Sequence, residues 1–146
     1  MIVAVFDANV LAPGFAGTIG ASVELIERWQ SGAFELVVSE HLLEELERTF
    51  GDHYYRSRFT TVQVARALAS LRNDATIIEI EPLERGIATH LEDDLVLATA
   101  LSAGADVLVT RDKQLLKLNV VQGLMIVHPA DFLAFLSASD APKDRN

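Results

Sequence analysis

Short apolar runs alternate along the chain with longer segments in which apolar residues recur at helical spacing. The runs are continuously apolar and rich in β-branched residues, which is typical of strands buried on both faces of a parallel sheet. Five strands are predicted on this basis, at residues 2–6, 34–38, 76–80, 106–110 and 124–127. Because the strands alternate with helices, we predict an α/β fold: a three-layer α/β/α sandwich with a central, mostly parallel, five-stranded sheet.

Helical signals occupy most of the sequence between these strands. Ser39 is a good N-cap directly after the second strand, and acidic residues follow it in the first helical turns. Helices are predicted at residues 23–29, 40–46, 61–71, 95–103 and 130–136. In contrast, Pro13, Gly14, Gly17 and Gly20 indicate a loop.

Neither an internal repeat nor a linker interrupts this pattern. The chain has 146 residues, of which 50% are hydrophobic and 23% charged, so it is long and apolar enough to bury a core. This composition excludes a disordered or collagen-like chain. We therefore expect one domain over residues 1–136, followed by a flexible C-terminal tail over residues 137–146.

Several classes of protein are excluded by what the sequence lacks. Without cysteine there is no disulfide framework, thiolate zinc site or cysteine nucleophile. No apolar run approaches the roughly 20 residues that span a bilayer, and the N-terminus lacks the basic segment of a signal peptide. We expect a soluble, cytoplasmic protein with no membrane partner. The four histidines show no metal-binding spacing, and no dinucleotide-binding, P-loop or serine-hydrolase motif is present.

Four acidic residues stand out by their position relative to the predicted strands. Asp7 follows the first strand, Asp112 follows the fourth, and Glu45 lies in the helix after the second. Asp93 stands at the start of the helix that leads to the fourth strand. In open parallel sheets, sites form beyond the carboxyl ends of the strands, where the strand order reverses. The four acids are therefore predicted to meet at one edge of the sheet.

Four carboxylates at close range are unfavourable unless a hard cation compensates their charge. Magnesium and manganese suit this role because they take oxygen ligands and keep waters that exchange for phosphate oxygens or act as nucleophiles. This chemistry indicates phosphodiester hydrolysis. Each acid also has a structural interpretation: Asp7 as a turn former, Asp112 as a turn cap, and Asp93 as a favourable charge at a helix N-terminus. Glu45 is one of four neighbouring glutamates, any of which could belong to a solvated helix face.

Four segments of the sequence resemble PIN-domain proteins in order and spacing: residues 5–11, 38–46, 93–101 and 104–116. The resemblance extends from residue 2 to about residue 136. It is strongest to the bacterial and archaeal branch described as toxins of toxin–antitoxin pairs, the VapC-like ribonucleases.

This resemblance implies a metal-dependent endoribonuclease that binds one or two Mg²⁺ or Mn²⁺ ions. Its catalytic and metal-binding acids would be Asp7, Glu45, Asp93 and Asp112. Asn9 and Thr110 would be their polar companions, hydrogen-bonded to the carboxylates or to the scissile phosphate. The sequence departs from the family pattern at His90, three residues before Asp93, where similar sequences often carry an acid.

The distribution of charge bears on an RNA substrate. A net charge of −9 argues, taken alone, against a nucleic-acid partner. Residues 48–72, however, contain five arginines and one acid, so this window carries +4 and the rest of the chain −13. We expect Arg56, Arg58 and Arg66 to contact RNA phosphates, with neighbouring aromatic residues stacking on bases. The alternative is a solvated helical arm whose aromatics pack against the core or a second subunit.

The expected partners are the RNA substrate and, from the resemblance alone, a small antitoxin protein. Apolar residues such as Trp29 and Phe59 would support a homodimer or higher oligomer. Two other functions stay open. One is a PIN-fold binding module that no longer cleaves. The other is an aspartate-based phosphatase or phosphotransfer domain with Asp7 as nucleophile, which Asn9 disfavours because the usual second acid is missing there.

Overall fold

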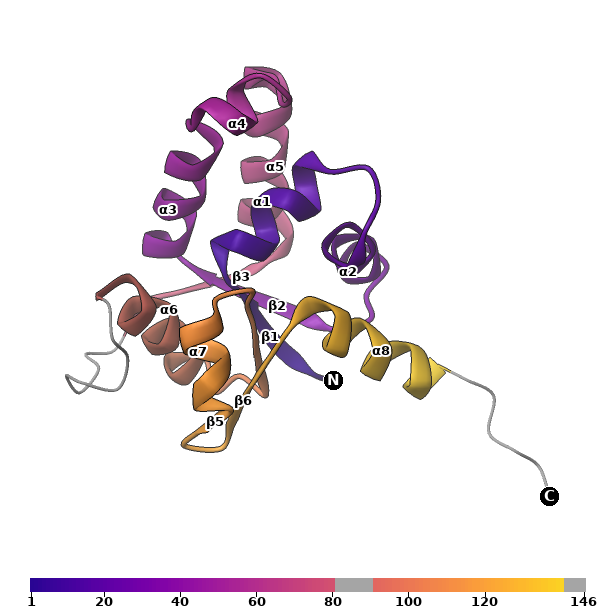
Figure 1. The fold of residues 1–146 in the computed structure, drawn as a ribbon, viewed down its shortest axis with the longest axis vertical. Helices are drawn as coiled ribbons and strands as arrows, with labels where there is room; N and C mark the ends of the chain where they lie inside the picture. Colours follow the sequence, from indigo (N-terminus) through magenta and orange to yellow (C-terminus); the bar gives the residue numbers. More distant parts are fainter. Residues whose placement is uncertain (81–90, 141–146) are drawn as a thin grey trace.

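A sheet of six strands flanked by helices forms the centre of the computed structural model, which describes residues 1–80 and 91–140, with side chains for 1–80 and 95–140 (Figure 1). The strands are β1 (Val3–Phe6), β2 (Glu35–Ser39), β3 (Thr76–Ile78), β4 (Val107–Val109), β5 (Val120–Val121) and β6 (Leu124–Val127). Their order is β3-β2-β1-β4-β6-β5, and all neighbours pair in parallel except β5 with β6. The predicted α/β fold with a mostly parallel sheet is confirmed, with six strands instead of five.

The additional strand is β5, which pairs with β6 at the edge of the sheet. Its two residues are too few to show a periodic pattern, so the sequence carries no strand signal there. Gln122 and Gly123 connect β5 to β6 with φ angles of 51° and 85°. Positive φ at both positions is the backbone conformation that the tightest hairpin connections require.

Eight helices are found in the described part of the chain: α1 (Ala8–Ala16), α2 (Ala21–Gln30), α3 (Glu40–Phe50), α4 (His53–Arg56), α5 (Thr61–Asp74), α6 (Leu91–Ser102), α7 (Lys113–Leu118) and α8 (Pro129–Asp140). All five predicted helices are present, although α8 runs four residues beyond its predicted end. The rest of the predicted tail, residues 141–146, lies outside the described residues. Among the described helices, none is by itself long and apolar enough to cross a membrane, although the bent pair α1 and α2 together has the length and composition.

The loop predicted at residues 13–20 is wrong over its first part, because α1 continues to Ala16. Asp7 caps this helix, and Leu11 within it is fully buried. Gly14 faces α2 so closely that a Cβ atom there would lie 2.6 Å from Cγ1 of Ile26. The glycine therefore permits close packing of two helices instead of ending one.

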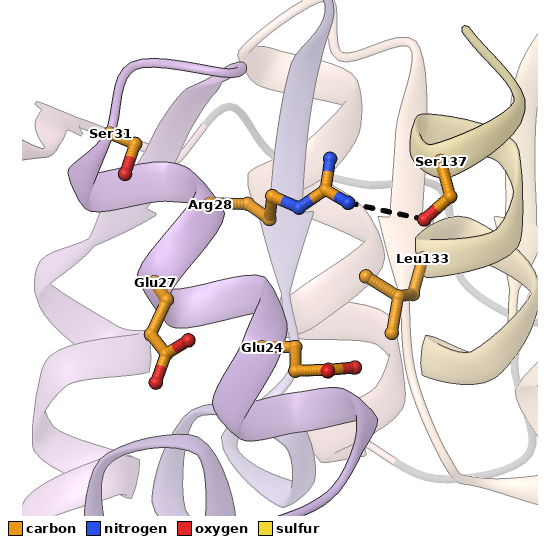
Figure 2. Close-up of a pocket in the computed structure, with 6 residues that line it drawn as sticks. All are labelled: Glu24, Glu27, Arg28, Ser31, Leu133 and Ser137. Carbon is orange, nitrogen blue, oxygen red and sulfur yellow. Dashed lines mark hydrogen bonds between the residues drawn. The ribbon is translucent and has the colours of Figure 1, made fainter. Parts of the chain in front are cut away.

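An aromatic cluster joins the sheet to α8. The ring of Phe34 lies 5.4 Å from that of Phe6 on β1 and 5.3 Å from that of Phe132 on α8. On the outer side, Arg28 of α2 donates a 3.2 Å hydrogen bond to Ser137 of α8 (Figure 2). Arg28 also pairs with Asp140, so α8 is held to α2 by two polar contacts. The aromatic contacts on the inner side and the polar contacts of Arg28 on the outer side together hold α8 against the rest of the fold.

Trp29 lies inside this part of the core. Its side chain is buried, and its ring meets that of Phe15 edge-on at 6.5 Å. Trp29 is therefore not available for the oligomer contact suggested from the sequence.

Residues 40–74, which we call the helical arm, rise from one edge of the sheet as α3, cross over at α4 and return as α5 (Figure 1). Inside the arm, Phe50 packs against Tyr55 and Phe59 with ring centroids 5.7 and 5.2 Å apart. Across it, Arg72 of α5 donates hydrogen bonds of 2.9 and 3.1 Å to the carboxylate of Glu40 on α3. These hydrogen bonds hold the pKa of Glu40 below its ordinary value. Phe59 is thus engaged within the arm, as the alternative interpretation expected.

Replacing Phe34 by alanine should reduce the free energy of unfolding by about 3–5 kcal/mol, because Phe34 is only 2% exposed and its loss opens a cavity between the sheet and α8. Phe135→Ala is the matched control, since that ring is 54% exposed, and it should change stability by only about 0.5 kcal/mol. Urea unfolding measures both, and equal losses would contradict the packing described for α8.

Candidate metal site at the carboxyl edge of the sheet

Two neighbouring strands end at the same point of the sheet. Phe6, the last residue of β1, pairs with Val109, the last residue of β4. The next residues, Asp7 and Thr110, are held there by backbone hydrogen bonds of 2.9 and 3.0 Å to the carbonyls of Val109 and Val127. The chain passes from β1 to β2 on one side and places β4 on the other, so this is where the strand order reverses. The topology therefore places Asp7 and Thr110 where a site is expected.

The hydroxyl group of Thr110 connects the polar residues of this edge. It donates a 2.8 Å hydrogen bond to Oδ2 of Asp7 and accepts one of 3.1 Å from the backbone N–H of Asp112. The side-chain amide of Asn9 lies 3.4 Å from the same hydroxyl and 3.5 Å from Asp7 Oδ2. Asn9 in turn accepts a 3.0 Å hydrogen bond from the backbone N–H of Arg111. We call these five residues the carboxylate network; it contains four of the six acids and companions predicted from the sequence.

Both acids of the network also begin a helix. Oδ1 of Asp7 accepts a 2.8 Å hydrogen bond from the N–H of Ala8 at the start of α1. Oδ1 of Asp112 accepts hydrogen bonds of 2.8 and 3.1 Å from the N–H groups of Gln114 and Leu115 at the start of α7. The capping role considered for Asp112 is therefore real, but it uses only one carboxylate oxygen. An ionised carboxylate offers about four lone-pair positions, so both acids retain capacity for a ligand.

Glu45 differs from the other glutamates of α3 in its surroundings. It is half-buried, whereas Glu40, Glu44 and Glu47 are exposed, and Glu40 is engaged with Arg72. Helix α3 packs against α1, which begins beside Asp7, and against α6. A half-buried acid on this helix is easier to explain as part of a site than as part of a solvated face.

Asp93 lies in the first turn of α6, but its side chain falls outside the described residues, as does His90. Helix α6 is held against the end of β2 by a buried hydrogen bond. The hydroxyls of Ser39 and Thr99 are buried and 2.8 Å apart, and because Thr99 donates to the carbonyl of Leu95, Ser39 must be the donor to Thr99. Since α6 returns from β3 to the parallel strand β4, its first turn lies at the carboxyl edge of the sheet. Sequence reasoning did not identify this buried hydroxyl pair as a support of the site.

The donor atoms at this edge can be compared with the needs of a metal ion. Within residues 1–80 and 95–140, no group of three or more histidine and acidic side chains is placed to hold a metal. Mg²⁺ often needs only one or two carboxylates and completes its coordination with waters and substrate phosphates. The carboxylates of Asp7 and Asp112 are hard oxygen donors of the kind that Mg²⁺ and Mn²⁺ prefer. The residues present therefore fit such an ion.

The arginines predicted to contact RNA all lie on the helical arm. Arg56 is in α4, Arg58 follows it, and Arg66 is in α5; the three side chains are exposed. None of them hydrogen-bonds to the carboxylate network within the described residues. Their contact with RNA stays a prediction.

Comparisons with known proteins identify the family and the fold. A family model described as PIN domain matches residues 3–114. The fold is similar to the crystal structure of PAE2754 from Pyrobaculum aerophilum, with 20% sequence identity and a TM-score of 0.62 over 94% of this chain and 98% of that one. At this identity the likeness supports the fold alone. No curated protein matches the sequence.

Thr110→Val should lower the free energy of unfolding by about 1–3 kcal/mol, because it keeps the shape of the side chain but leaves Asp7 Oδ2 and the N–H of Asp112 without the buried hydroxyl. Thr110→Ser retains the hydroxyl and should lose clearly less. Urea unfolding in metal-free buffer tests this, and a valine variant as stable as the serine variant would contradict the central role of the hydroxyl.

Proposed function

This chain belongs to the PIN domain family, whose members are generally metal-dependent nucleases, and on that premise we propose that it is an endoribonuclease that hydrolyses RNA phosphodiester bonds. The observation that supports the proposal most is the hydrogen-bonded pair of Asp7 and Thr110 beside Asp112, at the point where the strand order reverses. Carboxylates brought to such a crevice by the strands themselves are suited to hold a cation and a phosphate substrate.

We assign the binding of one or two Mg²⁺ or Mn²⁺ ions to Asp7, Glu45, Asp93 and Asp112. When bound, the metal supplies neutralisation of phosphate charge and activation of water. The protein contributes positioning. Thr110 and the first N–H of α1 hold the two oxygens of Asp7, so this carboxylate cannot rotate away from the edge. Ligand orientation of this kind is what metal sites require from their surroundings.

Asn9 also helps to hold Asp7 and the segment before Asp112 in place. Its amide group lies beside Asp7 and Thr110, while its carbonyl accepts the N–H of Arg111 and so fixes the start of the segment that carries Asp112. Movement of the β4–α7 connection would break these hydrogen bonds. The two carboxylates are therefore kept in one fixed relation before a substrate arrives, which favours catalysis by preorganisation.

The same features argue against Asp7 as a phosphotransfer nucleophile. It is only 7% exposed, and both of its oxygens accept hydrogen bonds. A nucleophile of that type needs an oxygen free to attack a phosphorus atom. The ligand role, in which a carboxylate can accept hydrogen bonds and bind a cation at once, fits these contacts better.

We further propose that the protein is the toxin component of a toxin–antitoxin pair, with a small antitoxin protein as partner and a homodimer or higher oligomer as its assembly. The motifs at residues 5–11, 38–46 and 104–116 support this branch of the family. Isolation of a stable complex with a small protein encoded beside this one would support the pairing, and cleavage that continues in its presence would count against it.

Asp7→Asn, Glu45→Gln, Asp93→Asn and Asp112→Asn should each reduce cleavage of a single-stranded RNA in Mg²⁺ or Mn²⁺ by roughly 10²-fold or more. Asparagine caps helices as well as aspartate does, so the variants at Asp7 and Asp112 keep the helix starts while losing the charge. Glu40→Gln is the control and should cleave like the parent, because Glu40 is exposed and paired with Arg72. If the parent leaves RNA intact with both metals, or the Asp7 variant cuts equally well, the proposed activity is wrong.

Metal binding should be visible without any RNA. At a Mn²⁺ concentration about 100 times its dissociation constant, the parent should gain about 2.7 kcal/mol of stability and unfold at a higher temperature. Asp7→Asn and Asp112→Asn should show a much smaller rise in Tm, measured by differential scanning calorimetry. A rise in Tm of the same size in these variants and the parent would place the ion elsewhere.

A further inference from the structure

A groove lies between the sheet and α8, apart from the carboxylate network. Its volume is about 490 Å³, and its lining comes from β4, β6, α8 and the residues just before β1 and β4. Val107 of β4 and Met125 of β6 are paired neighbours in this lining, and Phe132 and Phe135 belong to α8. None of the described residues that line the groove is a member of the carboxylate network. The groove is therefore a feature separate from the proposed metal site.

The two faces of β6 differ in how they are covered. Leu124 and Ile126 are buried, and α7 packs against this strand. Met125 lies between them in sequence and so points to the opposite face, where it is 53% exposed. On that face α8 turns inward instead, and the ring of Phe132 lies 6.1 Å from that of Phe6 on β1. Because the strands of a parallel sheet are normally covered on both faces, one layer is incomplete here within the described part of the chain.

The uncovered apolar surface continues beyond the groove onto β5. Val120 pairs directly with Met125, and side chains of directly opposed residues in an antiparallel pair lie on the same face of the sheet. Val120 is 51% exposed, and Phe135 across the groove is exposed to a similar extent. The apolar surface thus extends over β5, β6 and α8. Its spread favours a macromolecular partner over a small ligand, since small ligands are enclosed in a pocket.

The charged side chains that line the groove have one sign. They are Asp106, just before β4, and Asp131, in the first turn of α8, and both are exposed. Asp106 is also held in place, because it accepts a 2.8 Å hydrogen bond from the backbone N–H of Val3. No basic side chain is among the described residues of the lining. A complementary partner therefore carries lysine or arginine beside its apolar residues.

The same two acids disfavour a second copy of this chain as the occupant. In a two-fold contact, the same surface of each copy meets the other. Such a contact would bring the acidic margins of two identical grooves together without a base to pair with them. Like charges placed together in an interface weaken it.

We propose that the apolar face formed by the groove and Val120 docks an amphipathic helix of another protein, with lysine or arginine on both sides of its apolar stripe. A helix suits the site because it would lie beside α8 and complete the helical layer over β4 and β6. Apolar residues at i, i+3, i+4 and i+7 would contact Met125 and Phe135, and the flanking bases would face Asp106 and Asp131.

Docking can be observed at Met125 itself. The chain has two methionines, so protein labelled with ¹³C in the methionine methyl groups gives a simple NMR spectrum, and Met125→Leu assigns the signal. The probe is a synthetic helical peptide of about 18 residues with a leucine stripe flanked by lysines. A twin peptide has glutamate in place of every lysine. The lysine peptide should shift the Met125 signal to saturation and bind at least about tenfold more tightly than its twin.

Variants of the two kinds of contact each have a matched control. Phe135→Ala should weaken binding of the lysine peptide about tenfold, whereas Ile19→Ala, which removes another exposed apolar side chain, should leave binding within about twofold. Asp106→Asn with Asp131→Asn should reduce the preference for the lysine peptide over its twin. Glu27→Gln removes an exposed acid of α2 that is not part of the groove, and it should keep that preference.

The remaining outcomes decide against the proposal. A lysine peptide that leaves the Met125 signal unshifted, or a twin that binds equally well, would show that the stated partner is wrong. A Met125 signal that shifts with protein concentration alone, together with a dimer in sedimentation, would assign the face to a second copy. Because no RNA or metal is present, these results do not depend on whether the protein cleaves RNA.

Discussion

The hydrogen bond from the Thr110 hydroxyl to the Asp7 carboxylate is the contact on which the rest of the site depends. A carboxylate that is only 7% exposed, at the end of a strand in an apolar core, is unfavourable unless hydrogen bonds replace its lost water. The parallel pairing of β1 with β4 supplies the partner, since it places Thr110 beside Asp7 with its hydroxyl 2.8 Å away. The hydrogen bond that makes the burial of Asp7 favourable therefore also holds its carboxylate in the site.

Two helices beside the sheet begin at residues of the same site. Asp7 and Asp112 cap α1 and α7, so the acids that would hold a metal also determine where two helices begin. The buried hydroxyls of Ser39 and Thr99 place α6 against the end of β2. Charge is unevenly distributed along the chain: residues 48–72 of the helical arm carry five arginines and one acid, whereas Asp7 and Asp112 lie at the carboxyl edge. The net charge of −9 is therefore a poor guide to the partner, because a sum conceals the positive window at residues 48–72.

The sequence predicts those parts of the fold and site that depend on local pattern. Apolar runs mark five strands, and Asp7 and Asp112 are recognisable because each follows one. Other features depend on contacts between distant segments. Gly14 has the sequence character of a loop residue, but its role is to allow Ile26 of another helix to approach, which no local pattern reveals. Glu45 is distinguished from the neighbouring glutamates only by the packing of α3 against α1 and α6.

The central proposal is that a divalent cation is held by the carboxylates of Asp7 and Asp112, with the Thr110 hydroxyl bonded to the carboxylate of Asp7 and to the backbone N–H of Asp112. The most direct measurement is the anomalous diffraction of a crystal of the parent protein soaked in Mn²⁺. An anomalous peak in contact with a carboxylate oxygen of Asp7 and one of Asp112 is the predicted result. A crystal in which the Asp7–Thr110 hydrogen bond is intact but the manganese lies elsewhere, or does not bind at saturating concentration, would contradict it.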